Sequence, residues 1–324
     1  MKKLYVAALM VVILVGVAAP TWGYVVNIVR IGSGDLVRTK WASMPIRWQM
    51  NPVQGPNVTG TRTQAEVFAA AFATWQAVST ATISFTQGAP TAATTLHGDD
   101  TINLVSTNTA AAASDFPDGS LAFAIRIVKS PAGARDSFGR LVEFEGQILE
   151  SDIVFNPAVP FTTNTTSVAD RTDLQSVAAH EIGHLLGLDH SPMLSATMNP
   201  GTAEGYIYTR ALSPDDIIGA SVLYPTGAFS QRGKISGVIR TTANVPVYGA
   251  AVIVVNGSGT AVASTVTDPG GNYTVEGLSE GTYTVYAEPL DGPISIMNID
   301  SYSHPFIGVY KDAQVNTSFA TRSR

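Results

Sequence analysis

The sequence predicts an α+β domain followed by an all-β sandwich domain. In the first two thirds of the chain, two segments with helical spacing of apolar residues stand among short strand-like runs. From about residue 232 onward, runs rich in Val, Ile, Thr and Tyr alternate with turn residues, as in a small antiparallel sandwich. A stretch at 225–233 with Pro, Gly and Ser has the composition of a domain linker. The 324 residues suffice for two such domains.

The first 23 residues have the composition of a secretory signal peptide. Lys2 and Lys3 precede an apolar run of 16 residues, and Gly23 offers a small residue for cleavage. A membrane-spanning helix needs roughly 20 apolar residues. We therefore expect a signal peptide at 1–23 and domains at 24–227 and 232–324. The mature protein would be secreted and extracellular, without a stable membrane span, and an uncleaved anchor is the alternative.

Charge and cysteine content exclude several function classes. With 19 Lys and Arg against 25 Asp and Glu, the formal net charge of −6 argues against nucleic-acid binding. The chain has no cysteine, so disulfides, thiol nucleophiles and Cys-ligated zinc are excluded. A transition-metal site would have to use histidines and carboxylates.

The elements of the first domain follow from local patterns. Thr63 and Glu66 have capping-box spacing before a helix, whose apolar positions are typical of a core-facing surface. A second helix is predicted at 172–186, where Thr172 and Gln175 again have capping-box spacing and Gly187 would end the helix. Strands are predicted at 46–50, 82–85, 101–105, 121–128 and 148–155.

The second helix carries the most informative segment, His-Glu-Ile-Gly-His-Leu-Leu-Gly-Leu-Asp-His at 180–190. His180 and His184 are four residues apart, so both imidazoles project from one helical face and can hold one zinc ion. A sharp turn at Gly187 could bring His190 back as a third ligand, leaving the fourth position open. Glu181 would then serve as the general base for a zinc-activated water. The alternative is a core helix whose histidines only satisfy one another.

These residues resemble the metzincin zinc endopeptidases, and among them the matrixins. The matrixin signature H-E-x-G-H-x-x-G-x-x-H followed by Ser is complete from His180 to Ser191. The resemblance implies a metzincin catalytic domain, a twisted mixed sheet with an active-site helix. It also implies a methionine beneath the metal, the Met-turn. Met198 has the matching distance from His190, and Met193 is the competing candidate. Ser191 and Pro200 stand where astacins carry a Glu and a zinc-binding Tyr.

Flanking segments extend this resemblance over about 41–225. The segment 212–225 looks like the last matrixin helix, with Ser213 as N-cap and two Asp residues in the first turn. The segment 41–48 looks like the first strand of the catalytic domain. The segment 119–124 looks like the edge strand that pairs with an extended substrate. The resemblance thus implies that substrate is contacted by Leu121, Ala122, Asn199 and Pro200.

Two departures from the animal matrixins concern latency and metals. Without cysteine there is no thiol latch, and Asp35 is left open as a carboxylate that could block the metal instead. Only His97 lies elsewhere in this domain, so a second, structural zinc is expected to be missing. Structural calcium is left open, with no ligand assigned, because several carboxylates lie in loops or at strand ends: Asp99, Asp100, Asp115, Asp118 and Asp152.

The C-terminal part resembles carboxypeptidase-regulatory-like, or transthyretin-like, modules. The resemblance rests on the run at 235–239 and on the Gly-Asn-Tyr-Thr-Val and Gly-Thr-Tyr-Thr-Val repeats. Such modules are spacers or adhesive appendages, so a matrix or cell-surface ligand is left open and His304 is treated as a surface residue. Strands are predicted at 234–240, 250–255, 261–267, 272–276 and 282–288.

The resulting expectation is a secreted zinc-dependent endopeptidase that hydrolyses a protein or peptide substrate. One catalytic Zn(II) would be held by His180, His184 and His190, with Glu181 as the base. The alternative is a non-catalytic surface adhesin or binding protein that retains a zinc-metalloprotease fold. The intact Glu181 favours the enzyme, since a binding domain needs no base.

Overall fold

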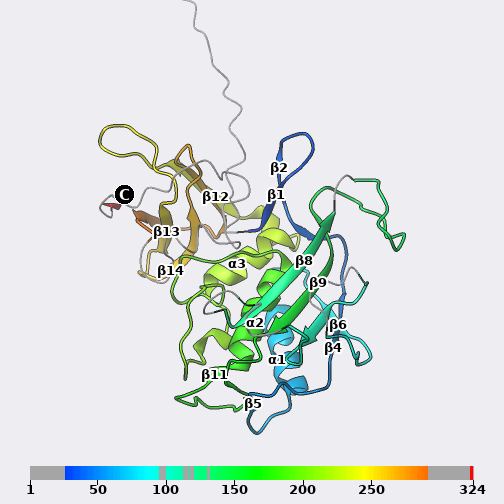
Figure 1. Ribbon diagram of the computed structural model, residues 1–324. Coiled ribbons are helices and arrows are strands. Elements are labelled where there is room, and N and C mark those ends of the chain that lie inside the picture. Colours follow the sequence, from blue (N-terminus) through cyan, green and yellow to red (C-terminus); the bar gives the residue numbers. More distant parts are fainter. Residues whose placement is uncertain are drawn as a thin grey trace, which may run out of the picture.

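The first domain is built on a mixed sheet, as expected (Figure 1). The computed structural model describes residues 26–94, 100–111, 116, 120–129, 132–290 and 322–323. The predicted signal peptide and five residues singled out above lie outside these ranges: His97, Asp99, Asp115, Asp118 and His304.

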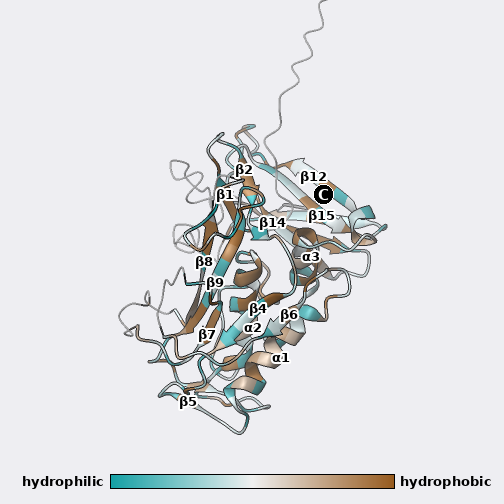
Figure 2. Ribbon diagram, turned by 90° about the vertical axis from the view of Figure 1, so that its right-hand side faces the viewer, coloured by the Kyte–Doolittle hydropathy of each residue, from teal (hydrophilic) through white to brown (hydrophobic). Residues whose placement is uncertain are grey.

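The main sheet has the order β3-β9-β7-β4-β6, and β8 pairs with β9. All its pairings are parallel except that between β8 and β9, so β8 forms an antiparallel edge. Its strands are β3 (Lys40–Trp41), β4 (Ile46–Met50), β6 (Phe85–Gln87), β7 (Leu104–Ser106), β8 (Ala122–Lys129) and β9 (Gln147–Phe155). The colouring in Figure 2 shows long hydrophobic stretches along β8 and β9.

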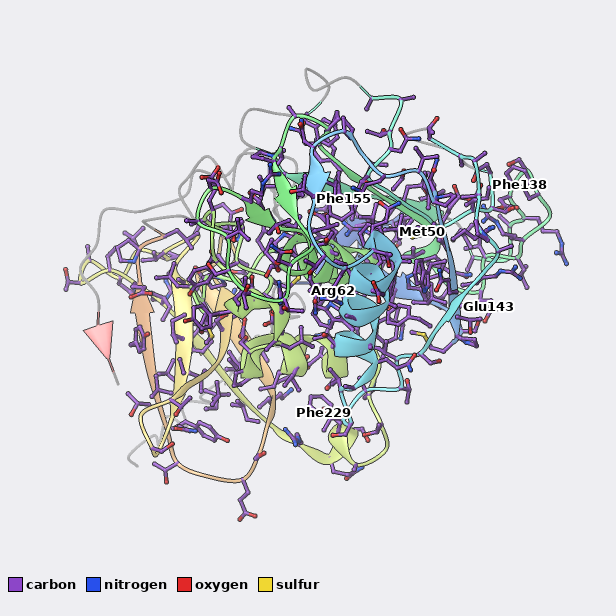
Figure 3. All side chains as sticks on the ribbon, turned by 90° about the horizontal axis from the view of Figure 1, so that it is seen from below. Met50, Arg62, Phe138, Glu143, Phe155 and Phe229 are labelled. Atoms are coloured by element: carbon purple, nitrogen blue, oxygen red, sulfur yellow. The ribbon has the colours of Figure 1, made fainter. Side chains whose placement is uncertain are left out.

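Two helices, α1 (Gln64–Gln76) and α2 (Leu174–Leu186), pack beside this sheet. The capping box predicted at the start of α1 is confirmed, because Thr63 accepts the Glu66 N–H and the Glu66 side chain accepts that of Thr63. The helices are joined by the indole of Trp75, which donates to the Ala179 carbonyl at 2.7 Å. In Figure 3, Met50 and Phe155 lie within the first domain, while exposed Phe138 lies at its periphery.

Three local predictions for this domain are wrong. The N-cap of α2 is Asp173, not Thr172, because Thr172 pairs with Phe161 in a short parallel ladder. The predicted strand at 41–48 is divided into β3 and β4, with a cis Met44–Pro45 peptide between them. The strand predicted at 82–85 lies later, as β6. Sequence patterns also missed five very short strands: β1 (Ile28–Arg30), β2 (Leu36–Arg38), β5 (Val58–Thr59), β10 (Phe161–Thr162) and β11 (Thr172–Asp173).

The C-terminal part is all-β, as predicted, and is called the β-domain below. Its strands form one two-stranded sheet, β12-β15, and one four-stranded sheet, β14-β13-β16-β17, with antiparallel pairing throughout. The edge strand β17 of the four-stranded sheet was not predicted from the sequence. The strands are β12 (Gly233–Val238), β13 (Ala251–Asn256), β14 (Ala261–Val266), β15 (Asn272–Leu278), β16 (Tyr283–Glu288) and β17 (Arg322–Ser323).

Helix α3 (Pro214–Leu223) and the short 3-10 helices η2 (Tyr208–Arg210) and η3 (Phe229–Gln231) complete the described elements. The last of these carries Phe229, labelled in Figure 3. Helix α3 lies beside β14 in Figure 1 and contacts both β14 and β15. One apolar cluster runs from Ile182 of α2 through Ile218 of α3 to Val275 of β15. The two domains therefore share a continuous core. Of the helices described, none combines the length and apolar character required to cross a bilayer.

Candidate metal centre

The metal centre is built on α2 and the turn that follows it. Gly187 ends the helix with φ of +101°, a conformation that glycine adopts without strain. A Cβ at this position would lie 2.3 Å from the Thr39 carbonyl oxygen, so a side chain is excluded on steric grounds as well. The turn reverses the chain and brings His190 back towards the helix.

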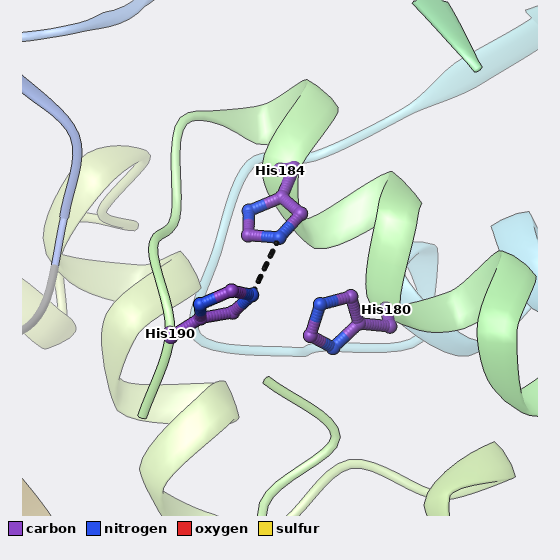
Figure 4. Close-up of side chains that lie close together, drawn as sticks. All are labelled: His180, His184 and His190. Atoms are coloured by element: carbon purple, nitrogen blue, oxygen red, sulfur yellow. Dashed lines mark hydrogen bonds between the residues drawn. The ribbon is translucent and has the colours of Figure 1, made fainter. Parts of the chain in front are cut away.

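The three predicted histidines converge, as Figure 4 shows. One donor atom from each of His180, His184 and His190 can be chosen so that all lie within 4.8 Å of one another. The Nε2 atoms of His184 and His190 are 3.3 Å apart. In the part of the chain that is described, this is the sole group of three or more His, Cys, Asp or Glu side chains arranged to hold a metal ion.

Hydrogen bonds fix the imidazoles of α2 in the metal-binding tautomer. His180 Nδ1 lies 2.8 Å from the Thr197 carbonyl oxygen, and His184 Nδ1 lies 3.0 Å from that of Leu188. A carbonyl oxygen can only accept, so each Nδ1 carries the proton and each Nε2 presents a lone pair. Burial lowers the pKa of both histidines, which keeps them neutral.

This donor set fits a zinc ion. Ligand bonds of about 2.0–2.1 Å at tetrahedral angles place two nitrogens roughly 3.3–3.4 Å apart, which matches the separation of the His184 and His190 Nε2 atoms. Three imidazoles without a carboxylate or thiolate among them are suited to zinc and unsuited to calcium or magnesium.

Glu181 follows His180 on α2 and is only 5% exposed. Burial raises the pKa of its carboxyl to about 8, against the lowering effects of the Arg126 charge and a hydrogen bond from the Ala124 backbone. With this pKa the carboxyl is mostly protonated at neutral pH, and the positive charge of a zinc ion bound beside it would favour the carboxylate that can accept a proton.

Arg126 of β8 was not singled out by the sequence, although an arginine within an apolar strand is unusual. Its Nη1 donates to the His184 carbonyl at 2.5 Å, and its charge acts on both Glu181 and Asp189. Burial raises the pKa of Asp189 to about 7, although Asp189 accepts the His190 N–H at 2.7 Å. Arg126 thus ties the edge strand to the metal-binding helix.

Met198 lies directly against α2. It is fully buried, and a Cβ on Gly183 would come within 2.1 Å of its sulfur. Asp216 of α3 accepts the backbone N–H of Thr197 and of Met198 at 2.8 and 3.0 Å. The competing candidate, Met193, instead packs against Ile253 of the β-domain.

The four predicted substrate contacts lie on two segments. Ala122 begins β8, whose second edge has no strand partner among the described residues, and the carbonyl of Leu121 accepts the Asn156 N–H. Asn199 is buried, and its side chain donates to the Ser191 carbonyl and accepts the Gly201 N–H. Pro200 is half-buried beside it.

Three further carboxylates within the described residues have local hydrogen-bond partners. Asp35 is exposed in the β1–β2 turn and accepts a hydrogen bond from Ser33 at 2.8 Å. Asp100 and Asp152, two of the carboxylates for which calcium was left open without assignment, accept the backbone N–H groups of Ile102 and Leu104.

A mixed α/β domain whose helix supplies two histidines, with a third delivered by the following glycine turn, defines the class of zinc metalloendopeptidases with a three-histidine site. A family model described as Matrixin matches residues 40–225, more than half of the chain. A second model, Carboxypeptidase regulatory-like domain, matches 234–291. The chain therefore belongs to the matrixin family of metalloendopeptidases, and both resemblances seen in the sequence are confirmed.

Curated relatives match over a shorter segment. The chain is 46% identical over 69 residues to metalloendoproteinase 4-MMP of Arabidopsis thaliana, covering 21% of this chain and 19% of that protein. It is 46% identical over 68 residues to matrix metalloproteinase-19 of Homo sapiens, covering 21% and 12%. For stromelysin-3 of Rattus norvegicus the identity is 46% over 61 residues, covering 18% and 12%. The aligned segment thus spans less than a fifth of each of these relatives.

Proposed function

We propose that the chain is a secreted zinc-dependent endopeptidase that cleaves protein or peptide substrates. The observation that carries the proposal is the convergence of His180, His184 and His190 beside the buried carboxyl of Glu181. The same family includes relatives named as metalloendoproteinase and matrix metalloproteinase. A binding protein that merely retained the fold would have no use for a buried carboxyl at this position.

In this proposal the histidines hold the metal and Glu181 moves the proton. Bound zinc would supply a Lewis acid that polarises the scissile carbonyl and makes water a stronger nucleophile near neutral pH. The Glu181 carboxylate accepts a proton from the attacking water and passes it to the leaving amine. Arg126 favours the ionised form of Glu181, and so the form that can accept this proton.

Substrate would lie along β8. The edge of β8 that has no strand partner in the described part of the chain offers backbone groups to an extended peptide in antiparallel pairing, which gives affinity without requiring particular side chains. Ala122 and Leu121 would contribute at the start of that edge. Asn199 and Pro200, on the loop after the third histidine, would border the pocket for the side chain that follows the scissile bond.

Three further parts of the proposal rest on sequence alone. Export would follow removal of residues 1–23, leaving the catalytic domain at 24–227 and the second domain at 232–324. N-terminal sequencing of protein recovered from the culture medium would test this, and an intact Met1 would contradict it. Structural calcium and a matrix or cell-surface ligand for the β-domain remain expectations.

The decisive experiment replaces Glu181 by Gln. The Gln side chain keeps the shape and hydrogen-bonding capacity of Glu but cannot take up the proton, so turnover should fall by about 10²–10⁴-fold while zinc binding is retained. Casein or gelatin cleavage by the secreted protein, together with the zinc content, measures both quantities. Chelation should abolish cleavage by the parent, and added zinc should restore it.

The matched control is Glu143→Gln, which makes the same chemical change at an exposed loop position (Figure 3). This variant should cleave at the parental rate. Parental cleavage by the Glu181→Gln protein would overturn the mechanism, and absence of cleavage by the zinc-loaded parent would favour the adhesin.

A further inference from the structure

A serine of the β-domain reaches a buried carboxylate of the first domain. Ser264 of β14 donates its hydroxyl to Asp215 of α3, with Oγ 3.0 Å from one carboxylate oxygen and 3.1 Å from the other. Ser264 is fully buried and Asp215 is 1% exposed. This hydrogen bond therefore lies inside the interface of the two domains, away from solvent screening.

The same carboxylate holds the residue that follows the third histidine. Ser191 donates its hydroxyl to Asp215 at 2.5 Å, and its Oγ accepts the Met193 N–H at 3.1 Å. The Ser191 N–H in turn donates to the Met198 carbonyl at 2.8 Å. Asp215 thus connects β14 of the β-domain with the loop at 190–198, which contains both His190 and the methionine under α2.

Apolar side chains also connect the loop at 190–198 with the β-domain. Met193 and Ala196 of this loop are buried in a small cluster with Ile253 of β13. Tyr286 of β16 packs against the same cluster. The loop at 190–198 is therefore enclosed by the β-domain on one side and by α2 and α3 on the other.

A buried carboxylate depends on its donors. Burial raises the pKa of Asp215 to about 7, and the hydrogen bonds from Ser191 and Ser264 oppose this effect. Removal of one donor leaves the buried carboxylate with fewer hydrogen bonds, which favours rearrangement of the groups that remain. Loss of the Ser264 hydroxyl would therefore change the hydrogen bonding of Ser191, the other donor to Asp215. Through Ser191 it would change the position of the neighbouring His190.

We propose that Ser264 is a positioning residue for the metal centre, and that the β-domain, acting through Asp215 and Ser191, holds the loop that carries His190. The proposal rests on the proposed function only in taking the three histidines as zinc ligands. It makes the carboxypeptidase-regulatory-like domain a part of the catalytic unit and gives it a role beyond that of a spacer.

The test uses the full chain with Ser264→Ala, Ser191→Ala and the double variant. Zinc affinity is measured by competition with a chelator, and ligand geometry by the absorption spectrum of the cobalt-substituted protein. Ser264→Ala should weaken zinc binding about tenfold, at the lower end of the effect of groups that orient metal ligands. The cobalt spectrum should shift as well.

Non-additivity shows whether the two serines act as one unit, through Asp215 and through the 3.4 Å contact between their own Oγ atoms. If they do, Ser264→Ala should weaken zinc binding much less in the Ser191→Ala background than in the parent. Effects that multiply, or unchanged zinc affinity and cobalt spectrum in Ser264→Ala, would overturn the proposal.

Thr267→Val is the matched control, because Thr267 is fully buried in the β-domain and its hydroxyl bonds only Val247 and Ala250 in the described contacts. It should lower the melting temperature and leave zinc affinity unchanged. An equal loss of zinc affinity in this variant would mean general loosening of the β-domain and contradict the proposal. Since none of these readouts requires turnover, failure of the peptidase hypothesis would be seen separately, with Glu181→Gln.

Discussion

Gly183 shows how a single position between the zinc-ligand candidates is constrained by packing. It lies one residue before His184, on the face of α2 that contacts Met198. A Cβ there would come within 2.1 Å of the Met198 sulfur and 2.9 Å of the Trp75 ring, and both side chains are buried. The glycine therefore allows the methionine to approach the backbone of the metal-binding helix.

Gly183→Ala should destabilise the protein by about 1–2 kcal/mol. Alanine gains up to about 1 kcal/mol from helix propensity, but forcing a methyl group into this contact costs about 1–3 kcal/mol, so we expect the steric cost to prevail. Urea unfolding of the zinc-loaded protein measures the net effect. Gly227→Ala is the control, because its Cβ would meet nothing within 4 Å. A gain in stability for Gly183→Ala would mean that Met198 moves aside without cost.

At the scale of the element, α3 positions the loop at 190–198 through two carboxyls of its first turn. Its first turn carries Asp215 and Asp216, which the sequence favours for their position near a helix N-terminus, and Ser213 forms the expected N-cap with a capping box. Both carboxyls are fully buried and accept hydrogen bonds from the loop at 191–198. The helix therefore places two carboxylates where each secures one end of that loop.

The raised pKa of Asp215 predicts a pH-dependent stability. The carboxyl titrates at about 7 in the folded protein and near 3.9 when unfolded, so the folded state binds more protons between these values. Its contribution to stability is therefore complete below about pH 4 and is lost as the pH rises through 7. Asp215→Asn should remove this component.

Urea unfolding of the two zinc-loaded proteins between pH 5 and 8 provides the measurement. The parent's stability relative to Asp215→Asn should fall with rising pH, by at most about 1.4 kcal/mol per pH unit. Both proteins retain the same histidines, but the Asp216 charge raises the pKa of Asp215, so the difference measures the titration of Asp215 together with its effect on Asp216. A difference that stays constant with pH would show that Asp215 is already ionised throughout this range.

At the scale of the whole molecule, local patterns predicted the elements better than the contacts between them. The capping box of α1 and the turn at Gly187 depend on residues close in sequence, and both are confirmed. Arg126 contacts a carbonyl 58 residues away, and Ser264 contacts a carboxylate 49 residues away. The spacing of residues along the chain does not predict contacts between residues so far apart. The roles of Arg126 and Ser264 could therefore be identified only from the folded structure.

The N-cap of α2 was misassigned for the same reason. Thr172 has the right spacing to Gln175, but its backbone pairs with Phe161 in the ladder of β10 and β11. Asp173 caps the helix while also accepting hydrogen bonds from Arg210, 37 residues later. Tertiary contacts therefore decided between two adjacent residues that both cap helices well.

The shared core predicts that the two domains unfold together. Gly277 of β15 has φ of +76°, and a Cβ there would come within 2.4 Å of the Phe229 ring and 3.1 Å of the Ile218 side chain. Gly277→Ala should therefore destabilise the molecule by roughly 2–4 kcal/mol, combining backbone strain with overpacking between the domains. Calorimetry should show a single transition, displaced to lower temperature as a whole.

Gly281→Ala separates this effect from a general intolerance of the β-domain to alanine. Its Cβ would be no closer than 3.7 Å to any neighbour, and its φ lies outside the left-handed region, so the transition should hardly move. Two transitions in the parent, of which Gly277→Ala displaced only the one belonging to the β-domain, would contradict a shared core. A single displaced transition would mean that the β-domain contributes to the stability of the metal-binding helix across Ile218 and the rest of α3.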